Sequence, residues 1–467
     1  MRSITLRNYR CFGDEPQTAR LAPLTLLVGE NSSGKTSLMA MVRALWDVAY
    51  DNRVPDFKQE PYDLGSFDEI AHHRGARGGR AQSFEAGFET DLTRGKRNGA
   101  SEGPLRFRAT FEAQWSAPTV SSRLLERGGY ALLHDISDGE SECVEISTPR
   151  GRWRCRTQTS RQPVRAAAAS EALSPIESLL FRFQFALHEG VRDDWKIEPL
   201  DGAPELSDTD VTGLNQALSL PGSRHRGVRH GRVERPFASA PVRSQPRRTY
   251  DPVRVYSDAF GDNVPTYLAQ LALREPASWA ELKERLEAFG HDAELFDEIR
   301  VRRLGQTDVD PFQVQVRKFG KGVKGPYRNL VDVGYGISQV LPVVTEMLRV
   351  GGSNTLLLQQ PEVHLHPSAQ AALGSLLCQM VLAGRQRQTK QLIVETHSDF
   401  IIDRVRMAVA DERHDLSPAD VSIVYFERRG LDSRLHSISV DHIGNIEGAP
   451  PDYRQFFLRE LQRSLSF

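Results

Sequence analysis

The sequence predicts an α/β fold: a mixed sheet around a glycine-rich loop, an antiparallel β subdomain, and an insertion of helix and loops. Three observations predict it. An apolar run, a glycine-rich loop and an amphipathic helix follow one another over residues 24–48. Apolar and polar residues alternate along much of 80–157, as in antiparallel strands with one buried face. Helical and strand patterns then alternate from 337 to 427, which is typical of a parallel sheet.

The composition limits the class of protein. The chain has 467 residues, with 60 Lys plus Arg against 61 Asp plus Glu, so its formal net charge is −1. This charge and the 39% hydrophobic content exclude a disordered chain and a uniformly basic one. The apolar stretch 166–187 is broken by Ser174-Pro175, so we expect no membrane span and a cytoplasmic protein. Its 4 cysteines show no CxxC spacing and predict neither disulfides nor a zinc site.

Further elements follow from the patterns. A half-buried strand is expected at residues 2–10, where Ile4 and Leu6 alternate with polar residues. Helices are expected within 262–300 and near 166–188, 337–349, 367–384, 398–411 and 451–464. Strands are expected at 312–316, 355–358, 391–396 and 421–427, and 118–240 is interpreted as an insertion with loops.

One segment carries the strongest chemical signal. Residues 29–36, Gly-Glu-Asn-Ser-Ser-Gly-Lys-Thr, match GxxxxGK[ST] at every fixed position. The segment stands between a strand and a helix, where backbone N–H groups and a helix N-terminus can hold phosphates. Lys35 is expected to reach the β and γ phosphates of a nucleotide, and the Thr36 hydroxyl to bind Mg²⁺. The predicted nucleotide-binding residues are Gly29, Glu30, Asn31, Ser32, Ser33, Gly34, Lys35, Thr36 and Ser37.

Such a loop needs a second strand that brings carboxylates to the metal and to the attacking water. The candidate is 356–367, Leu-Leu-Leu-Gln-Gln-Pro-Glu-Val-His-Leu-His-Pro. This run resembles a segment of ABC-class ATPases related to the OLD proteins, which in turn resemble RecF and SMC heads. Three further segments fit: 4–12 resembles the first strand of such heads, 332–339 their signature loop, and 396–399 their switch-histidine loop.

The resemblance implies an ABC-type P-loop NTPase head that uses ATP and Mg²⁺. Two heads are expected to pack head to tail, as a dimer or within a higher oligomer, with each ATP between the loop of one copy and the signature loop of the other. Ser338 and Gln339 would contact the γ-phosphate in trans, and His397 in cis. The expected parts are 1–117 with the phosphate loop and β subdomain, 118–255 with an Arg-rich insertion, 256–335 as a helical lobe, and 336–467 as the second half of the head.

The two positions that should be acidic are glutamines. Gln359 stands at the metal-binding position and Gln360 at the catalytic position, and an amide cannot act as a general base. Two interpretations stay open. In one, Glu362 takes over a carboxylate role; the catalytic candidates are then Glu362, Gln360 and His397, and the metal ligands are Thr36 and Gln359. In the other, ATP binds and holds the dimer while hydrolysis is slow or absent.

An arginine-rich stretch spans residues 221–254, where only Glu234 and Asp251 oppose the positive charge. Such a stretch suits the phosphate backbone of DNA or RNA. The alternative is a solvated basic loop that pairs with acidic surface elsewhere or contacts ATP. Residues 240–243 and 246–252 also resemble a recurring segment of bacterial ATPases in this group, which implies fixed structural roles for Arg243 and Arg248. Its arginines are Arg224, Arg226, Arg229, Arg232, Arg235, Arg243, Arg247, Arg248 and Arg254.

OLD proteins continue into a Toprim nuclease domain, for which the residues after Asp399 are too few. We therefore expect an ATPase subunit whose output lies in a partner, similar to components of bacterial antiphage systems such as PARIS and Septu. The expected function is an ATP-dependent sensor or scaffold that forms homo-oligomers and controls an effector such as a nuclease. The alternatives are a RecF-like DNA-repair ATPase and a non-hydrolysing ATP-binding regulator.

Overall fold

The computed structural model describes residues 1–50, 55–75, 78–91, 103–136, 143–157, 195–218, 234–251, 258–307, 310–320, 323–386, 390–413, 415–451 and 453. The helix expected near 166–188 lies outside the described residues, and so does nearly all of the one expected near 451–464. The chain forms two compact units. The first consists of Met1–Leu21, Ser32–Arg235 and Glu427–Leu435, and the second of Ala22–Asn31, Pro236–Phe426 and His436–Phe467. The four-part division expected from the sequence stays a prediction.

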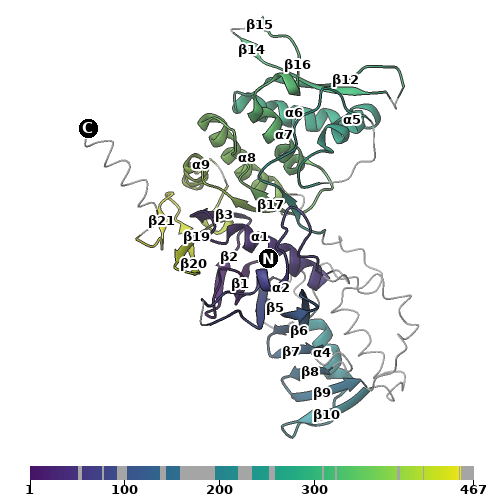
Figure 1. Cartoon of the computed structure of the whole chain (residues 1–467), viewed down its shortest axis with the longest axis vertical. Helices are drawn as coiled ribbons and strands as arrows, with labels where there is room; N and C mark the ends of the chain where they lie inside the picture. The colour runs from purple at the N-terminus through teal and green to yellow at the C-terminus, as the bar shows by residue number, and fades with distance from the viewer. Residues whose placement is uncertain are drawn as a thin grey trace. The chain divides into compact units, whose positions relative to one another are not determined.

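A nine-stranded antiparallel sheet dominates the first unit (Figure 1). Phe84 of β4 faces Phe111 of β5, and their rings stack with centroids 4.7 Å apart on the buried face. The antiparallel strands expected within 80–157 are confirmed, and β6 to β10 continue the same sheet into the segment interpreted as an insertion. In spatial order the strands are β10 (Trp195–Leu200), β9 (Gly151–Thr157), β8 (Cys143–Thr148), β7 (Tyr130–Asp135), β6 (Ala117–Arg127), β5 (Leu105–Gln114), β4 (Ser83–Thr90), β1 (Ser3–Arg7) and β2 (Gln17–Arg20).

Among the residues that the structure describes in the first unit, three helices accompany this sheet: α1 (Lys35–Tyr50), α2 (Phe67–Ile70) and α4 (Asp208–Leu218). Helix α1 contacts β4 and β5, and α4 contacts β6, β7 and β8. The predicted apolar face of α1 is confirmed, because its members are all buried: Leu38, Met39, Val42, Leu45 and Trp46.

A seven-stranded sheet organises the second unit. The pairs from β11 to β19 are parallel, as the alternation of helices and strands predicted. Strand β3, the strand before the glycine-rich loop, lies between β18 and β19 although it comes from the other end of the sequence. In spatial order the strands are β11 (Phe237–Ser239), β17 (Thr355–Gln359), β18 (Gln391–Glu395), β3 (Leu24–Gly29), β19 (Val421–Arg429), β20 (Asp432–Val440) and β21 (Ile446–Glu447).

Helices and two small sheets complete the second unit. Helix α8 contacts α9 as well as β18 and β3, and buried residues such as Leu26, Leu358 and Val394 form one apolar core. The helices are α5 (Val264–Arg274), α6 (Pro276–Asp292), α7 (Tyr335–Leu348), α8 (Pro367–Gln386) and α9 (Asp399–Ala410). The small sheets contain β12 (Glu298–Arg303), β13 (Phe312–Arg317) and β16 (Arg328–Asn329), and β14 (Phe319–Gly320) with β15 (Val323–Lys324). Within the described part of the chain, every helix is too short or too polar to cross a bilayer.

Candidate functional site: the carboxyl edge of the parallel sheet

Three neighbouring parallel strands of the second unit end at one edge of the sheet. β3 ends at Gly29, β18 leads into Thr396 and His397, and β17 leads into Gln360. The Thr396 N–H donates to the Leu27 carbonyl at 3.1 Å, and the Gln360 N–H donates to the Glu395 carbonyl at 2.9 Å. In open α/β sheets ligands bind beyond the carboxyl ends of the strands, so this edge is the candidate site.

Gly29 opens the glycine-rich loop in a conformation that other residues rarely adopt. Its φ is +139°, and a Cβ at this position would lie 2.5 Å from the Phe426 carbonyl oxygen on β19. A side chain would therefore collide with the neighbouring strand. The first fixed glycine of the motif is required by this close approach.

From Ser32 on, the loop belongs to the first unit and leads into α1. The Cys11 thiol donates to the Ser33 carbonyl at 3.4 Å, and Arg428 Nη1 donates to the Ser32 carbonyl at 2.7 Å. Gly34, with φ of +102°, has no room for a Cβ, which would lie 2.4 Å from Cys11 Sγ. Cys11 and Arg428 thus fix the loop from outside, and sequence reasoning missed both because they are 22 and 396 residues away from their partners.

Lys35 and Thr36 start α1, as the motif predicts. Lys35 is buried, whereas Thr36 is exposed. The Tyr9 hydroxyl donates to the Ser37 carbonyl at 3.0 Å, which ties the first turn of the helix to the segment after β1. The α1 N-terminus carries no acidic residue in its first turn, so no side-chain carboxylate there competes with a phosphate.

Glu362 is a buried carboxylate three residues beyond the end of β17. It is only 8% exposed, and its Oε1 accepts a hydrogen bond from the His397 backbone N–H at 2.8 Å. Its Oε2 has no hydrogen-bond partner among the described residues. Burial raises the pKa of Glu362, and the hydrogen bond from the His397 backbone acts in the opposite direction. An oriented carboxylate with a raised pKa and one unused oxygen is suited to accept a proton.

The two glutamines occupy the strand end itself. Gln359 is 3% exposed, its backbone N–H donates to Ser239 Oγ at 3.3 Å, and its Nε2 has no partner among the described residues. Gln360 has φ of +39°, a left-handed conformation that costs a non-glycine residue roughly 1–3 kcal/mol. Such strain is maintained only where the surroundings impose it, and here it turns the chain toward Glu362.

The metal donors expected from the sequence are neutral. A hydroxyl at Thr36 and an amide at Gln359 can each offer an oxygen to Mg²⁺, but neither brings charge. The described residues contain no group of three or more His, Cys, Asp or Glu that could hold a metal ion. This donor set fits a magnesium ion that arrives with the phosphates of its nucleotide rather than one held by the protein alone.

The predicted signature loop leads into the N-terminus of α7. Ser338 Oγ donates to the Tyr335 carbonyl at 2.9 Å, and the Gln339 side chain is 1% exposed and bonded to the backbone of Arg243. Tyr335 also packs edge-on against His364, with ring centroids 5.3 Å apart. The structure thus joins the signature segment to the turn after β17 within one chain, and the trans contact to ATP stays a prediction.

Several arginines of the arginine-rich stretch bond within their own unit. Arg235 Nε donates to Asp47 Oδ1 at 2.7 Å in the first unit, and Arg248 pairs with Asp332 at 2.7 Å in the second. These contacts agree with the alternative of structural pairing for the two residues. Nucleic-acid binding stays a prediction. Five of the nine arginines on which it depends lie outside the described residues: Arg224, Arg226, Arg229, Arg232 and Arg254.

The fold and the motif define a P-loop nucleotide-binding domain of the α/β class. A glycine-rich phosphate loop joins a central parallel strand to a helix, and the strand ending in Gln359 lies two places away in the same sheet. A family model described as "AAA domain, putative AbiEii toxin, Type IV TA system" matches residues 156–403, more than half of the chain. The chain therefore belongs to this family, AAA_21.

Comparison with other proteins adds the following similarities. No curated protein matches the sequence. The SMC head bound to the C-winged helix domain of ScpA is 11% identical with a TM-score of 0.44, over 94% of this chain and 97% of that one. The SMC head domain from Thermotoga maritima is 10% identical with a TM-score of 0.39, over 93% and 97%. The Smc head with an extended coiled coil, bound to the C-terminal domain of ScpA and derived from Pyrococcus furiosus, is 10% identical with a TM-score of 0.41, over 99% of each chain.

Proposed function

We propose that this ATPase binds MgATP on residues 29–36, pairs head to tail with a second copy, and hydrolyses ATP with Glu362 as general base. One observation carries the proposal: a buried carboxylate, held by one oxygen and unpartnered at the other among the described residues, beside the strand ends of the parallel sheet. Backbone groups around Ser338 and Gln339 of the neighbouring copy would complete the phosphate site, and His397 would contact the γ-phosphate in cis.

The hydrolysis step follows from these roles. A water molecule attacks the γ-phosphorus, Glu362 Oε2 takes a proton from that water, and the bond between the γ-phosphorus and the bridging oxygen breaks to release ADP. Lys35 would stabilise the charge on the β and γ phosphates, and Thr36 and Gln359 would hold a magnesium ion that supplies further positive charge there. The raised pKa of Glu362 makes its carboxylate a stronger base than an exposed glutamate.

The neutral glutamines favour a second candidate function. Gln359 and Gln360 offer no charge to a metal and no base to a water, so ATP binding without turnover would make the chain a nucleotide-dependent regulator. A phosphate-release assay separates the two functions. Wild type is expected to release phosphate, Lys35→Ala to lose ATP binding, and Glu362→Gln to bind ATP with turnover reduced by about 10²–10⁴-fold. Tight ATP binding by a wild type that releases no phosphate would establish the regulator instead.

We further propose that ATP-dependent assembly lets the protein act as a sensor or scaffold that controls an effector in antiphage defence. The family description, which names a toxin of a type IV toxin–antitoxin system, supports a role linked to an effector. The native protein would be purified with and without ATP, and the proteins that accompany it identified. Retention of an effector such as a nuclease in one nucleotide state only is expected, whereas a monomer without partners in both states contradicts the role.

A RecF-like DNA-binding ATPase predicts a different result. Affinity for duplex DNA would then require ATP and would fall steeply as the salt concentration rises, because each phosphate contact releases bound counterions. Filter binding at two salt concentrations, with and without ATP, tests this function directly.

A further inference from the structure

Arg243 is a buried cation in the second unit. It is 3% exposed, and burial lowers its pKa to about 10 while the charge of Glu362 opposes that shift. A buried charge is tolerated when it is paired or hydrogen-bonded. Among the described residues, the hydrogen bonds of this guanidinium go to main-chain oxygens, and its Nε has no partner.

Both acceptors of the guanidinium lie at the end of β17. Nη2 donates to the Gln359 carbonyl at 2.9 Å and to the Gln360 carbonyl at 3.4 Å, and Nη1 reaches the Gln360 carbonyl at 3.5 Å. These carbonyls belong to the two residues that replace the expected carboxylates. One side chain therefore fixes the backbone at the strained turn that leads to Glu362.

The main chain of Arg243 is bonded to α7 at the same time. The Arg243 N–H donates to Gln339 Oε1 at 3.0 Å, and Gln339 Nε2 donates to the Arg243 carbonyl at 3.3 Å. The Gln339 side chain is 1% exposed, and both of these hydrogen bonds lie within its own chain. Gln339 and Arg243 thus form a closed pair of hydrogen bonds at the start of the signature helix.

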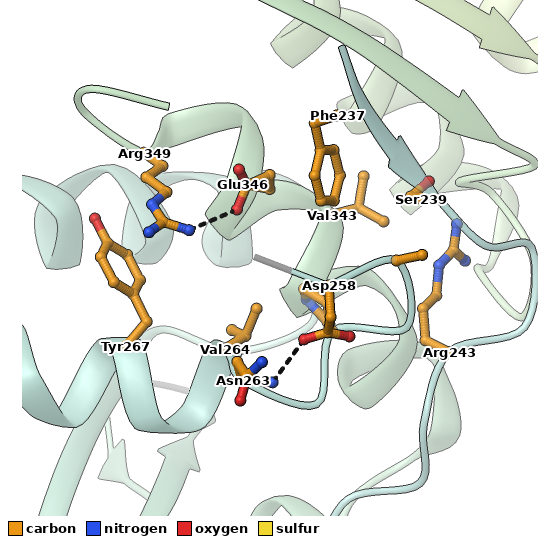
Figure 2. Close-up of a pocket in the computed structure, with 13 residues that line it drawn as sticks. Phe237, Ser239, Arg243, Asp258, Asn263, Val264, Tyr267, Val343, Glu346 and Arg349 are labelled. Carbon is orange, nitrogen blue, oxygen red and sulfur yellow. Dashed lines mark hydrogen bonds and ion pairs between the residues drawn. The ribbon is translucent and has the colours of Figure 1, made fainter. Parts of the chain in front are cut away.

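Neighbouring contacts hold this segment in place. The Ala240 N–H donates to the Ala259 carbonyl at 2.8 Å, and the Ser244 N–H donates to the Phe260 carbonyl at 3.1 Å. Figure 2 shows the Arg243 side chain beside Ser239, at the border of a hollow that Val343 of α7 also lines. The hollow comprises about 400 Å³ of empty space, counted together with space that is open to solvent.

We propose that Arg243 is a positioning residue that couples the start of α7 to the end of β17. A contact made at the start of α7 would then fix the backbone conformation beside Glu362. This inference rests on the proposed function, in which α7 meets the ATP of a neighbouring copy while β17 serves the chain's own ATP. Binding of ATP at one site would thereby align the end of β17 at the other ATP site.

The coupling is tested with Arg243→Gln, Gln339→Ala and the double variant in the full-length protein. ATP affinity is measured with a fluorescent ATP analogue, and turnover by phosphate release at saturating ATP. Each single variant is expected to keep its ATP affinity within about threefold and to lose turnover on the order of 10²-fold, because the catalytic strand end is displaced. The double variant should lose no more than Arg243→Gln alone, since both changes break one connection.

Two controls make the outcome specific. Arg349→Gln is the matched control. Arg349 lines the same hollow but pairs with Glu346 of α7 rather than with the end of β17. This variant should leave turnover unchanged. Arg243→Lys should recover part of the turnover, since an ammonium group can still donate to the carbonyls.

Additive losses in the double variant, or turnover near wild type in Arg243→Gln, would overturn the coupling while the proposed function stands. Should Arg243→Gln fail to fold, Gln339→Ala decides by the same two measurements. A wild type that releases no phosphate would overturn the proposed hydrolysis, and the coupling with it.

Discussion

Replacing Glu362 by glutamine should have opposite effects on turnover and on stability. In Glu362→Gln the side-chain amide would keep an oxygen as acceptor for the His397 N–H, which is now 2.8 Å from Oε1. The second carboxylate oxygen, which has no partner among the described residues, would be replaced by a neutral NH₂ group. The backbone geometry is therefore preserved. Loss of the base should reduce turnover by about 10²–10⁴-fold.

The stability effect follows from the direction of the pKa shift. Because burial raises the pKa of Glu362 above its ordinary 4.5, the folded chain holds this proton more tightly than the unfolded chain does. As the pH rises above 4.5, the unfolded chain releases the proton first, so the wild type loses stability until the pH passes the folded pKa. The variant has no such loss. At high pH it should be the more stable protein.

Urea unfolding of both proteins between about pH 5.5 and 8.5 measures the difference, which should grow with pH and then level off. Glu346→Gln provides a matched control, because Glu346 is also buried but pairs with Arg349 at 3.3 Å, so its loss should destabilise the fold. If Glu362→Gln is no more stable than wild type at the upper end of this pH range, burial does not raise the pKa of Glu362. If it keeps turnover within about tenfold, Glu362 is not the general base.

Three further changes test the fold. Gly29→Ala would place a Cβ 2.5 Å from the Phe426 carbonyl oxygen, so it should lower the free energy of unfolding by roughly 1–3 kcal/mol. It should also weaken binding of a fluorescent ATP analogue. Unchanged binding contradicts the close approach. Leu358→Ala, at a fully buried position of β17, should lower the free energy of unfolding by about 2–5 kcal/mol in urea. Arg235→Met removes the cation that pairs with the Asp47 side chain, which is 7% exposed, and should lower the free energy of unfolding by about 3–5 kcal/mol. Adding Asp47→Leu to the same chain should restore most of this loss. Differential scanning calorimetry of both variants measures the two changes.

The elements that the sequence predicts well are those with local signals. The strand, loop and helix around residues 24–48 are recognisable because apolar periodicity and fixed glycines lie within one short segment. The same holds for β4 and β5, whose alternating phenylalanines predict their buried face. Local patterns do not show how strands are ordered in space, so the place of β3 between β18 and β19 was not foreseeable.

The parts of the site that escaped prediction depend on distant contacts. A fixed structural role was expected for Arg243, but not its acceptors. These are carbonyls 116 and 117 residues further along the chain, and backbone carbonyls leave no trace in a sequence motif. The sequence identified Gln339 as a ligand-contacting residue, whereas its side chain is bonded to Arg243. Glu362 was recognised as a candidate, but its burial and its unpartnered oxygen are visible only in the described part of the fold.

The central position of β3 has a consequence for synthesis of the chain. This apolar strand ends at Gly29, but its partner β18 begins at Gln391 and β19 at Val421. At about 5–20 residues per second, a ribosome needs roughly 20–70 s to proceed from the end of β3 to the start of β18. During that interval the Leu24–Gly29 segment has neither neighbour, so fragments that stop before residue 391 should accumulate as aggregates.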